Sequence, residues 1–171
     1  MVDFTKIIRT IPDFPEKGVL FRDITTILQE PEALRAAIDA LDKSLEKIDF
    51  DIIVGPESRG FIFGVPLAYN LNKGFIPIRK KGKLPYKTIS KEYELEYGKA
   101  TIEMHIDSIK PGQKVVIVDD LLATGGTCKA ICELIEEAGG EVVSLNFFIE
   151  LLGLNGREKL EGYNIESIVK Y

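Results

Sequence analysis

The sequence contains no tryptophan, one histidine (His105) and only two cysteines among its 171 residues. Cys128 and Cys132 are too few for a disulfide framework or a four-cysteine zinc site. They are spaced four apart in an expected helix and so share one face, where we expect small buried thiols in a reducing compartment. A histidine-based metal centre or a serine–histidine–aspartate triad would depend on His105 alone.

Long apolar runs and a basic excess are also missing. No stretch approaches the roughly 20 apolar residues of a membrane span, and no basic region followed by an apolar run marks a signal peptide. The net charge is −5, from 22 basic and 27 acidic residues, which argues against a general nucleic-acid coat. We therefore expect a cytoplasmic protein that binds neither membranes nor nucleic acids.

Positive charge is concentrated in one short segment of this acidic chain. Six of the 22 basic residues and none of the 27 acidic ones lie in residues 79–91, so the remainder carries a balance of −11. A charge run is most often a solvated loop, and the residues alone favour that interpretation. The alternative is a local site for an anionic ligand.

Apolar runs that alternate with helical periodicity predict an α/β fold. Runs without polar alternation indicate strands covered on both faces, and they occur at residues 51–55, 75–78, 114–119 and 141–149. Helical patterns precede or separate them at residues 31–47, 60–71 and 126–138. This alternation, and a length typical of one domain, favour a central, mainly parallel sheet flanked by helices.

Two segments depart from the alternation. The apolar spacing in residues 4–11 predicts an amphipathic helix that Asp3 caps and Pro12 ends, followed by an irregular stretch to about residue 26. In residues 83–104, alternating apolar and acidic residues around Gly98 predict a β-hairpin that leaves the sheet.

The most informative segment is the strand-to-helix turn of residues 115–127, VVIVDDLLATGGT. Two glycines, two threonine hydroxyls and a helix N-terminus suit a phosphate, and ligands of open α/β sheets bind beyond the carboxyl ends of strands. Asp119 and Asp120 would repel a phosphate placed against them, but they suit ribose hydroxyls or Mg²⁺ nearby. The segment therefore predicts a phosphorylated ribose; the alternative is a capped helix start after a glycine turn.

A second turn, Glu57-Ser58-Arg59, follows another expected strand and precedes a helix. It offers backbone amides, a hydroxyl and a guanidinium to an anion. An ordinary strand-to-helix turn with a surface arginine is an equally good interpretation of these residues alone.

Taken in order, these segments resemble the type I phosphoribosyltransferases, and the string VDDLLATGGT resembles the adenine-specific branch of that family. Further matching segments lie at residues 13–24, 57–61, 79–85, 93–98 and 156–160. The resemblance implies a single domain of residues 1–171, with a small purine-binding hood at about residues 1–30 and a mobile catalytic β-hairpin loop at about residues 79–104.

The resemblance also implies roles for individual residues. Glu96 is the expected general acid/base, and the turn at Glu57 is expected to contain a cis peptide bond that does not involve proline. The phosphoribose site is expected to comprise Asp119, Asp120, Ala123, Thr124, Gly125, Gly126 and Thr127. Pyrophosphate is expected to bind at Glu57, Ser58, Arg59, Arg79, Lys80 and Lys83, and adenine at Leu20, Phe21 and Arg22.

The implied reaction belongs to purine salvage. A 5-phosphoribosyl group passes from phosphoribosyl pyrophosphate to adenine, giving AMP and pyrophosphate, with Mg²⁺ carried by the donor and held indirectly by Asp119 and Asp120. A cytoplasmic homodimer is expected from the resemblance. Two alternatives stay open: a phosphoribosyltransferase for xanthine or guanine, and a non-catalytic regulator that senses the donor and binds nucleic acid.

Overall fold

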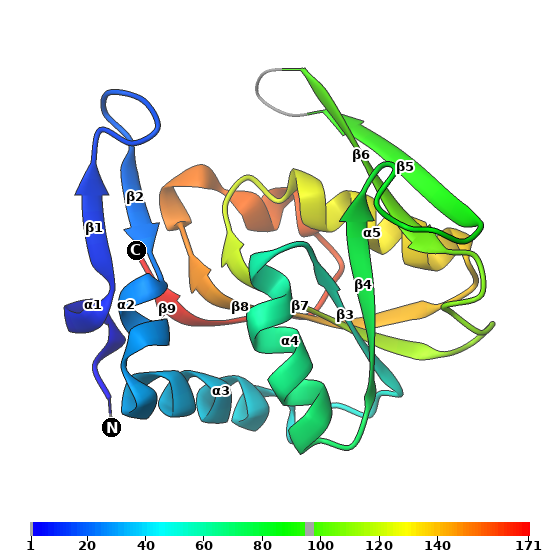
Figure 1. The fold of residues 1–171 in the computed structure, drawn as a ribbon, viewed down its shortest axis with the longest axis horizontal. Helices are drawn as coiled ribbons and strands as arrows, with labels where there is room; N and C mark the ends of the chain where they lie inside the picture. The colour runs from blue at the N-terminus through cyan, green and yellow to red at the C-terminus, as the bar shows by residue number, and fades with distance from the viewer. Residues whose placement is uncertain (1, 95–97) are drawn as a thin grey trace. The chain divides into compact units, whose positions relative to one another are not determined.

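In the computed structural model, which describes residues 2–94 and 98–171, most strands join one seven-stranded sheet (Figure 1). In chain order the elements are α1 (Phe4–Ile7), β1 (Arg9–Pro12), β2 (Leu20–Asp23), α2 (Thr25–Gln29), α3 (Pro31–Leu45), β3 (Ile52–Pro56), α4 (Arg59–Asn70), β4 (Gly74–Lys80), β5 (Thr88–Glu94), β6 (Lys99–His105), β7 (Lys114–Leu122), α5 (Gly126–Glu137), β8 (Glu141–Glu150), the 3-10 helices η1 (Leu152–Leu154) and η2 (Gly156–Leu160), and β9 (Ile165–Lys170).

The large sheet has the strand order β5-β6-β4-β3-β7-β8-β9. Its strands from β4 to β9 in this order run parallel, which confirms the predicted mainly parallel α/β architecture. The predicted hairpin forms from β5 and β6, but it does not leave the sheet. It extends the sheet, because β6 pairs antiparallel with β4 at Arg79↔Glu103 and Lys80↔Ile102.

The central strands are apolar because helices cover both of their faces. Val115, Val116, Ile117 and Val118 on β7 are all fully buried. One buried cluster joins β7 and β8 to the apolar face of α5, which begins after Gly125. Such burial contributes roughly 25 cal/mol per Å² of apolar surface and is the main source of stability of the large sheet and its helices.

The connections between parallel strands place a reversal at the centre of the sheet. The chain passes from β3 through α4 to β4 on one side, and from β7 through α5 to β8 on the other. Because such crossovers are right-handed, α4 and α5 cover opposite faces. The carboxyl ends of β3 and β7 therefore flank the switch point at which ligands of open α/β sheets bind.

The chain divides into two compact units, residues 1–40 and 41–171. In the first unit, β1 and β2 form a two-stranded antiparallel sheet, with Arg9 opposite Asp23. The Arg9 guanidinium donates to the Asp23 carboxylate at 2.5 and 3.0 Å. The prediction of a single domain of residues 1–171, with a hood of about residues 1–30, stays a prediction.

The predicted N-terminal helix is wrong in its length. Asp3 caps it as expected, accepting from the Thr5 amide at 3.2 Å, but α1 ends at Ile7. The next residues form β1, because pairing with β2 satisfies their backbone groups and places Arg9 beside Asp23. The stretch predicted to be irregular contains that partner strand and the start of α2.

Cys128 and Cys132 are unbridged and buried on α5, as expected, and their mutual hydrogen bond together with burial raises the pKa of the Cys128 thiol. Across residues 2–94 and 98–171, no helix combines the length and the apolar character needed to cross a membrane.

The C-terminal strand β9 was not predicted, and an ion pair ties it to the sheet. Glu150, at the end of β8, is 3% exposed and accepts two bonds from Arg157, at 2.6 and 2.8 Å. Arg157 also donates to the Ile165 carbonyl at 3.2 Å, and Ser167 donates to Glu150. Arg157 and then Ser167 outweigh burial and lower the pKa of Glu150.

Replacing Arg157 with methionine is expected to destabilise the chain by about 3 kcal/mol at neutral pH, because Glu150 is left charged and buried without its partner. For a chain of this size that corresponds to about 6–12 °C in melting temperature. The Glu150–Arg157 pair stabilises the native state above the ordinary glutamate pKa and loses this contribution as pH falls. In the variant, burial raises the Glu150 pKa instead. The difference in melting temperature between the unaltered chain and the variant should therefore become smaller as the pH is lowered from 7 to 4.

The matched control is Lys159→Met, which removes the same charge from an exposed position of η2. Its melting temperature should stay close to that of the unaltered chain at both pH values. Equal losses in the two variants, or a gap that widens in acid, would contradict the role given to the Glu150–Arg157 pair.

Candidate active site

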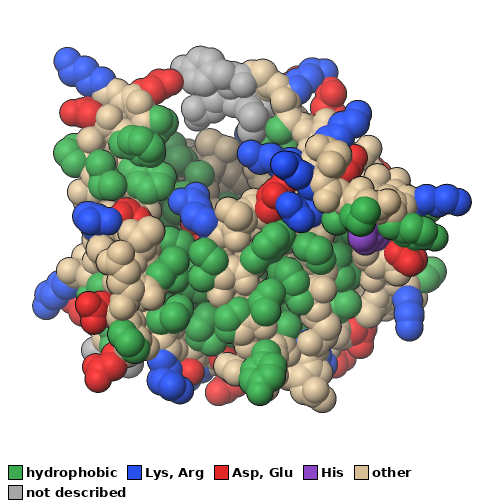
Figure 2. Space-filling view, viewed as in Figure 1, with side chains coloured by type: hydrophobic (Ala, Val, Ile, Leu, Met, Phe, Trp, Pro, Cys, Tyr) green, Lys and Arg blue, Asp and Glu red, His purple; other side chains and the backbone are tan. Residues whose placement is uncertain are grey.

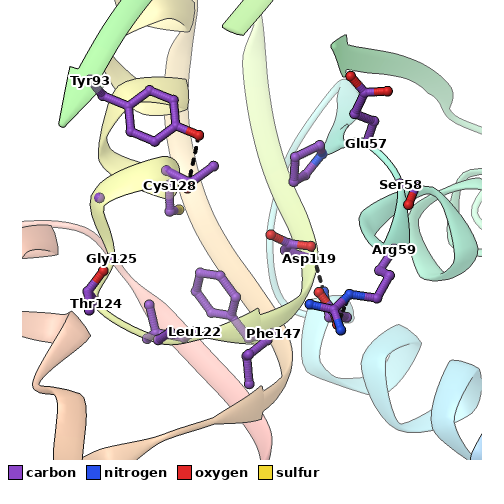
Figure 3. A pocket seen from close by; sticks show the side chains of 16 residues that line it. Glu57, Ser58, Arg59, Tyr93, Asp119, Leu122, Thr124, Gly125, Cys128 and Phe147 are labelled. Atoms are coloured by element: carbon purple, nitrogen blue, oxygen red, sulfur yellow. Dashed lines mark hydrogen bonds and ion pairs between the residues drawn. The ribbon is translucent and has the colours of Figure 1, made fainter. Parts of the chain in front are cut away.

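A cavity of about 270 Å³ opens at the switch point between β3 and β7 (Figure 3). Its lining comes from residues 56–59 and 119–128, together with Tyr93 and Phe147. Both strand-to-helix turns identified in the sequence therefore meet at one site, as the fold requires of neighbouring parallel strands.

The two turns approach closely because residue 60 is a glycine. A Cβ atom at Gly60 would lie 2.7 Å from the Pro56 ring and 3.1 Å from Asp119 Oδ1. No side chain fits between the start of α4 and the end of β7. Because Gly60 has no side chain, the Glu57–Arg59 turn can lie against Asp119 and Asp120.

Asp119 and Asp120 lie near the end of β7, between the buried residues 115–118 and the buried Leu122. Charge is unfavourable in such surroundings. Arg59 Nε lies 2.9 Å from Asp120 Oδ2, and the Asp120 amide donates to Asp119 Oδ1 at 2.8 Å (Figure 3). Burial, and then the charge of Asp120, raises the pKa of Asp119 well above its ordinary value. Burial also raises the pKa of Asp120, although Arg59 opposes this effect. Hydroxyl donors or a cation would stabilise the ionised pair.

Residues 123–125 connect β7 to α5, and Gly126 and Thr127 are the first residues of the helix. Gly125 has a left-handed backbone with φ of 79° and immediately precedes the helix, so the first amides of α5 face the cavity without intrahelical partners. These amides and the Thr124 and Thr127 hydroxyls are hydrogen-bond donors at the cavity wall, the kind of groups that bind an anion at a helix N-terminus.

The Glu57 turn has a cis peptide bond between Glu57 and Ser58, as expected. The Glu57 carboxylate is directed away from Asp119 (Figure 3). It accepts from Arg79 Nε at 3.0 Å and from the Lys80 amide at 2.5 Å. Burial alone would raise the pKa of Glu57, but Lys80 and Arg79 outweigh it and lower the pKa. The carboxylate is thus bound to Arg79 and Lys80 of the basic segment. Only the backbone of Glu57 then remains available to contact an anion.

Arg79, Lys80 and Lys83 lie at and just beyond the end of β4, and none of them lines the cavity. The chain turns here: the Lys83 amide donates to the Lys80 carbonyl at 3.2 Å, and Gly82 donates to Glu103 at 2.9 Å. The Glu57 carboxylate joins Arg79 and Lys80 to the cavity.

The remaining predicted residues belong to the first unit or fall outside the described residues. Leu20, Phe21 and Arg22 belong to β2 in the first unit, where Phe21 packs edge-on against Phe14 and Arg22 donates to Thr10 at 2.5 Å. Glu96 lies outside the described residues.

Sequence reasoning missed Tyr93 and Phe147 among the lining residues. Tyr93 belongs to an alternating strand pattern and to a segment that matches the catalytic loop of the family, but it was not among the predicted site residues. Its place in the cavity depends on the hairpin register and on the packing of β5 against α5, neither of which a local pattern contains.

A phosphoribosyl transferase domain model matches residues 23–165. An adenine phosphoribosyltransferase from Lachnoclostridium phytofermentans is 66% identical over 164 residues, which is 96% of this chain and 94% of that protein. The chain belongs to the adenine phosphoribosyltransferase family.

Solved structures of this family agree in fold. The enzyme from Thermoanaerobacter pseudethanolicus is 54% identical, with a TM-score of 0.95 over 98% of this chain and 97% of that one. The Saccharomyces cerevisiae enzyme, solved with an imino-altritol bisphosphate and adenine, is 39% identical, with a TM-score of 0.90 over 96% and 95%. The resemblance in the sequence is thereby confirmed, and so is the expected fold.

Proposed function

We propose that this chain transfers the 5-phosphoribosyl group of phosphoribosyl pyrophosphate to adenine, releasing AMP and pyrophosphate in purine salvage. The observation that carries the proposal is that three groups of residues line one cavity. They are residues 123–127, which we call the phosphate loop, the carboxylate pair Asp119 and Asp120, and the Glu57–Arg59 turn. A bisphosphate analogue and adenine bound to the yeast relative support the same pair of ligands.

The 5-phosphate is assigned to residues 123–127. Unpaired amides at the start of α5, the helix dipole and the two threonine hydroxyls favour a dianion there. Asp119 and Asp120 then receive the ribose 2- and 3-hydroxyls. These donors favour the ionised carboxylates, against the burial that raises their pKa values.

The pyrophosphate is assigned to the Glu57–Arg59 turn, with the basic segment beside it. Ser58 and Arg59 line the cavity, and Glu57 anchors Arg79 and Lys80. As the bond to pyrophosphate breaks, positive charge develops on the ribose and negative charge on the leaving group. Fixed groups of opposite sign stabilise that separation without reorganising.

The side chains of this site suit magnesium as an ion that arrives bound to the substrate. Asp119 and Asp120 offer the carboxylate oxygens that Mg²⁺ prefers, and Arg59 already neutralises part of their charge. Among residues 2–94 and 98–171 no group of three or more acidic, histidine or cysteine side chains could hold a metal by itself. Bound with the donor, Mg²⁺ would neutralise charge on the departing pyrophosphate.

Adenine is assigned to the segment Leu20–Arg22, and Glu96 is the proposed group that accepts or shares the N9 proton. A positioned carboxylate that assists proton transfer in this way contributes about 10²–10⁴-fold to the rate. Both assignments rest on the family pattern.

We also propose a cytoplasmic homodimer. Figure 2 shows hydrophobic side chains gathered over α4, and on this helix Val65 and Tyr69 are 48% and 86% exposed. Apolar residues at such exposure suit a partner surface. Light scattering should give twice the mass of the chain, and a monomer at micromolar concentration would contradict this proposal.

The test is nucleotide formation by the purified chain with phosphoribosyl pyrophosphate and Mg²⁺, supplied in parallel with adenine, guanine or xanthine. AMP should form fastest, and chelation of Mg²⁺ should abolish it. Faster turnover of guanine or xanthine would shift the proposal to another purine. The absence of any nucleotide, with sequence-specific DNA or RNA binding instead, would favour a donor-sensing regulator.

A further inference from the structure

Strand β5 is fastened along α5 by one of its faces. Ile89, Lys91 and Tyr93 alternate along the strand and therefore point to the same side. Ile89 and Tyr93 pack against the buried cluster that includes α5, while Lys91 pairs with Glu133 at 3.2 Å and with Glu137. The hairpin is thus docked on the helix whose first turn forms the phosphate loop.

The end of this docked face reaches the phosphate loop. Thr127 Oγ1 donates to the Tyr93 hydroxyl at 3.3 Å, and both residues line the cavity (Figure 3). A Cβ atom at Gly126 would lie 3.6 Å from the Glu94 carbonyl, so the backbone of β5 also lies over the start of α5. One phenol hydroxyl from the hairpin is therefore placed among the groups assigned to the 5-phosphate.

The chemistry of the two hydroxyls suits a shared anion. A tyrosine hydroxyl can donate or accept, so it is free to donate to a phosphate oxygen once Thr127 does the same. Hydrogen bonds to a phosphate are charge-assisted and stronger than the neutral contact between two hydroxyls. The tyrosine ring keeps its apolar body against the cluster while its polar tip faces the cavity.

We propose that the Tyr93 hydroxyl binds the 5-phosphate of the donor and of AMP together with Thr127, so that this phosphate also fastens β5 to α5. The inference rests on the proposed function, in which residues 123–127 hold that phosphate. By linkage, whatever the phosphate gains from Tyr93 also strengthens the docking of β5 on α5.

Tyr93→Phe tests the proposal because it removes the hydroxyl and keeps the ring packing. The dissociation constants of AMP and ribose 5-phosphate should rise by about tenfold, since each loses one hydrogen bond to a charged group. Adenine and pyrophosphate, which have no 5-phosphate, should bind as before. AMP should slow amide hydrogen exchange in residues 88–94 of the unaltered chain, and do so less in the variant.

Tyr86→Phe is the matched control, because Tyr86 precedes β5, is 56% exposed and contacts His105 rather than the phosphate loop. It should leave all four dissociation constants unchanged. If Tyr93→Phe binds AMP as tightly as the unaltered chain, or loses adenine and AMP equally, the phosphate role is wrong. If the unaltered chain binds neither AMP nor ribose 5-phosphate, the proposed function itself fails.

Discussion

Replacing Glu96 with glutamine is expected to lower the turnover of adenine by about 10²–10⁴-fold, the range for a lost general acid/base. Glutamine keeps the size of the side chain and its carbonyl acceptor but cannot take up the N9 proton. The Michaelis constants of both substrates should change little, because the proton moves only as the new glycosidic bond forms. Steady-state rates across pH measure this, and the acidic limb that reports the free carboxylate should disappear in the variant.

Glu94→Gln provides the control for that experiment. Glu94 ends β5, two residues before Glu96, and is exposed. The same chemical change there should alter turnover by less than about threefold, the size expected of a surface substitution. A comparably small loss in Glu96→Gln would remove Glu96 from the mechanism, while equal large losses in both variants would indicate damage to the hairpin rather than lost proton transfer.

The parts of this molecule that sequence predicts best are those whose cause is local. The run VVIVDDLLATGGT contains a buried strand, two carboxylates and a glycine-containing helix start, and all three form, although β7 continues past the carboxylates to Leu122. The same holds for Asp3 as a helix cap, because its acceptor and the Thr5 amide lie two residues apart.

Features that depend on residues distant in the sequence were either not predicted or predicted wrongly. The apolar spacing in residues 4–11 is genuinely helical, but it extends past the point where pairing with β2 becomes more favourable. The partner of Arg59 is Asp120, and that of Glu57 is Arg79; the loop sequences alone gave no sign of either pair. These ion pairs follow from strand order, and the order β4-β3-β7 is a property of the assembled sheet.

Replacing Gly125 with alanine is expected to lower kcat/KM for phosphoribosyl pyrophosphate by about 10²-fold, the effect of displacing a binding group by about 1 Å. A Cβ atom at Gly125 would lie 2.5 Å from the carbonyl oxygen of Gly156, at the start of η2. Gly156 also packs closely on this loop, since a Cβ atom there would lie 2.3 Å from the Ala123 carbonyl oxygen. Both contacts are backbone against backbone, so the phosphate loop itself has to move.

The dihedral cost of such a substitution can be separated from the displacement of the loop. Gly162 also has a left-handed backbone, with φ of 94°, but a Cβ there would meet nothing within 4 Å. Gly162→Ala should therefore incur the same left-handed penalty, about 1–2 kcal/mol in the free energy of unfolding, and keep the donor kinetics of the unaltered chain. If Gly125→Ala also keeps those kinetics, residues 123–127 do not hold the phosphate. If Gly162→Ala loses donor kinetics as severely, lower stability rather than loop geometry is the cause.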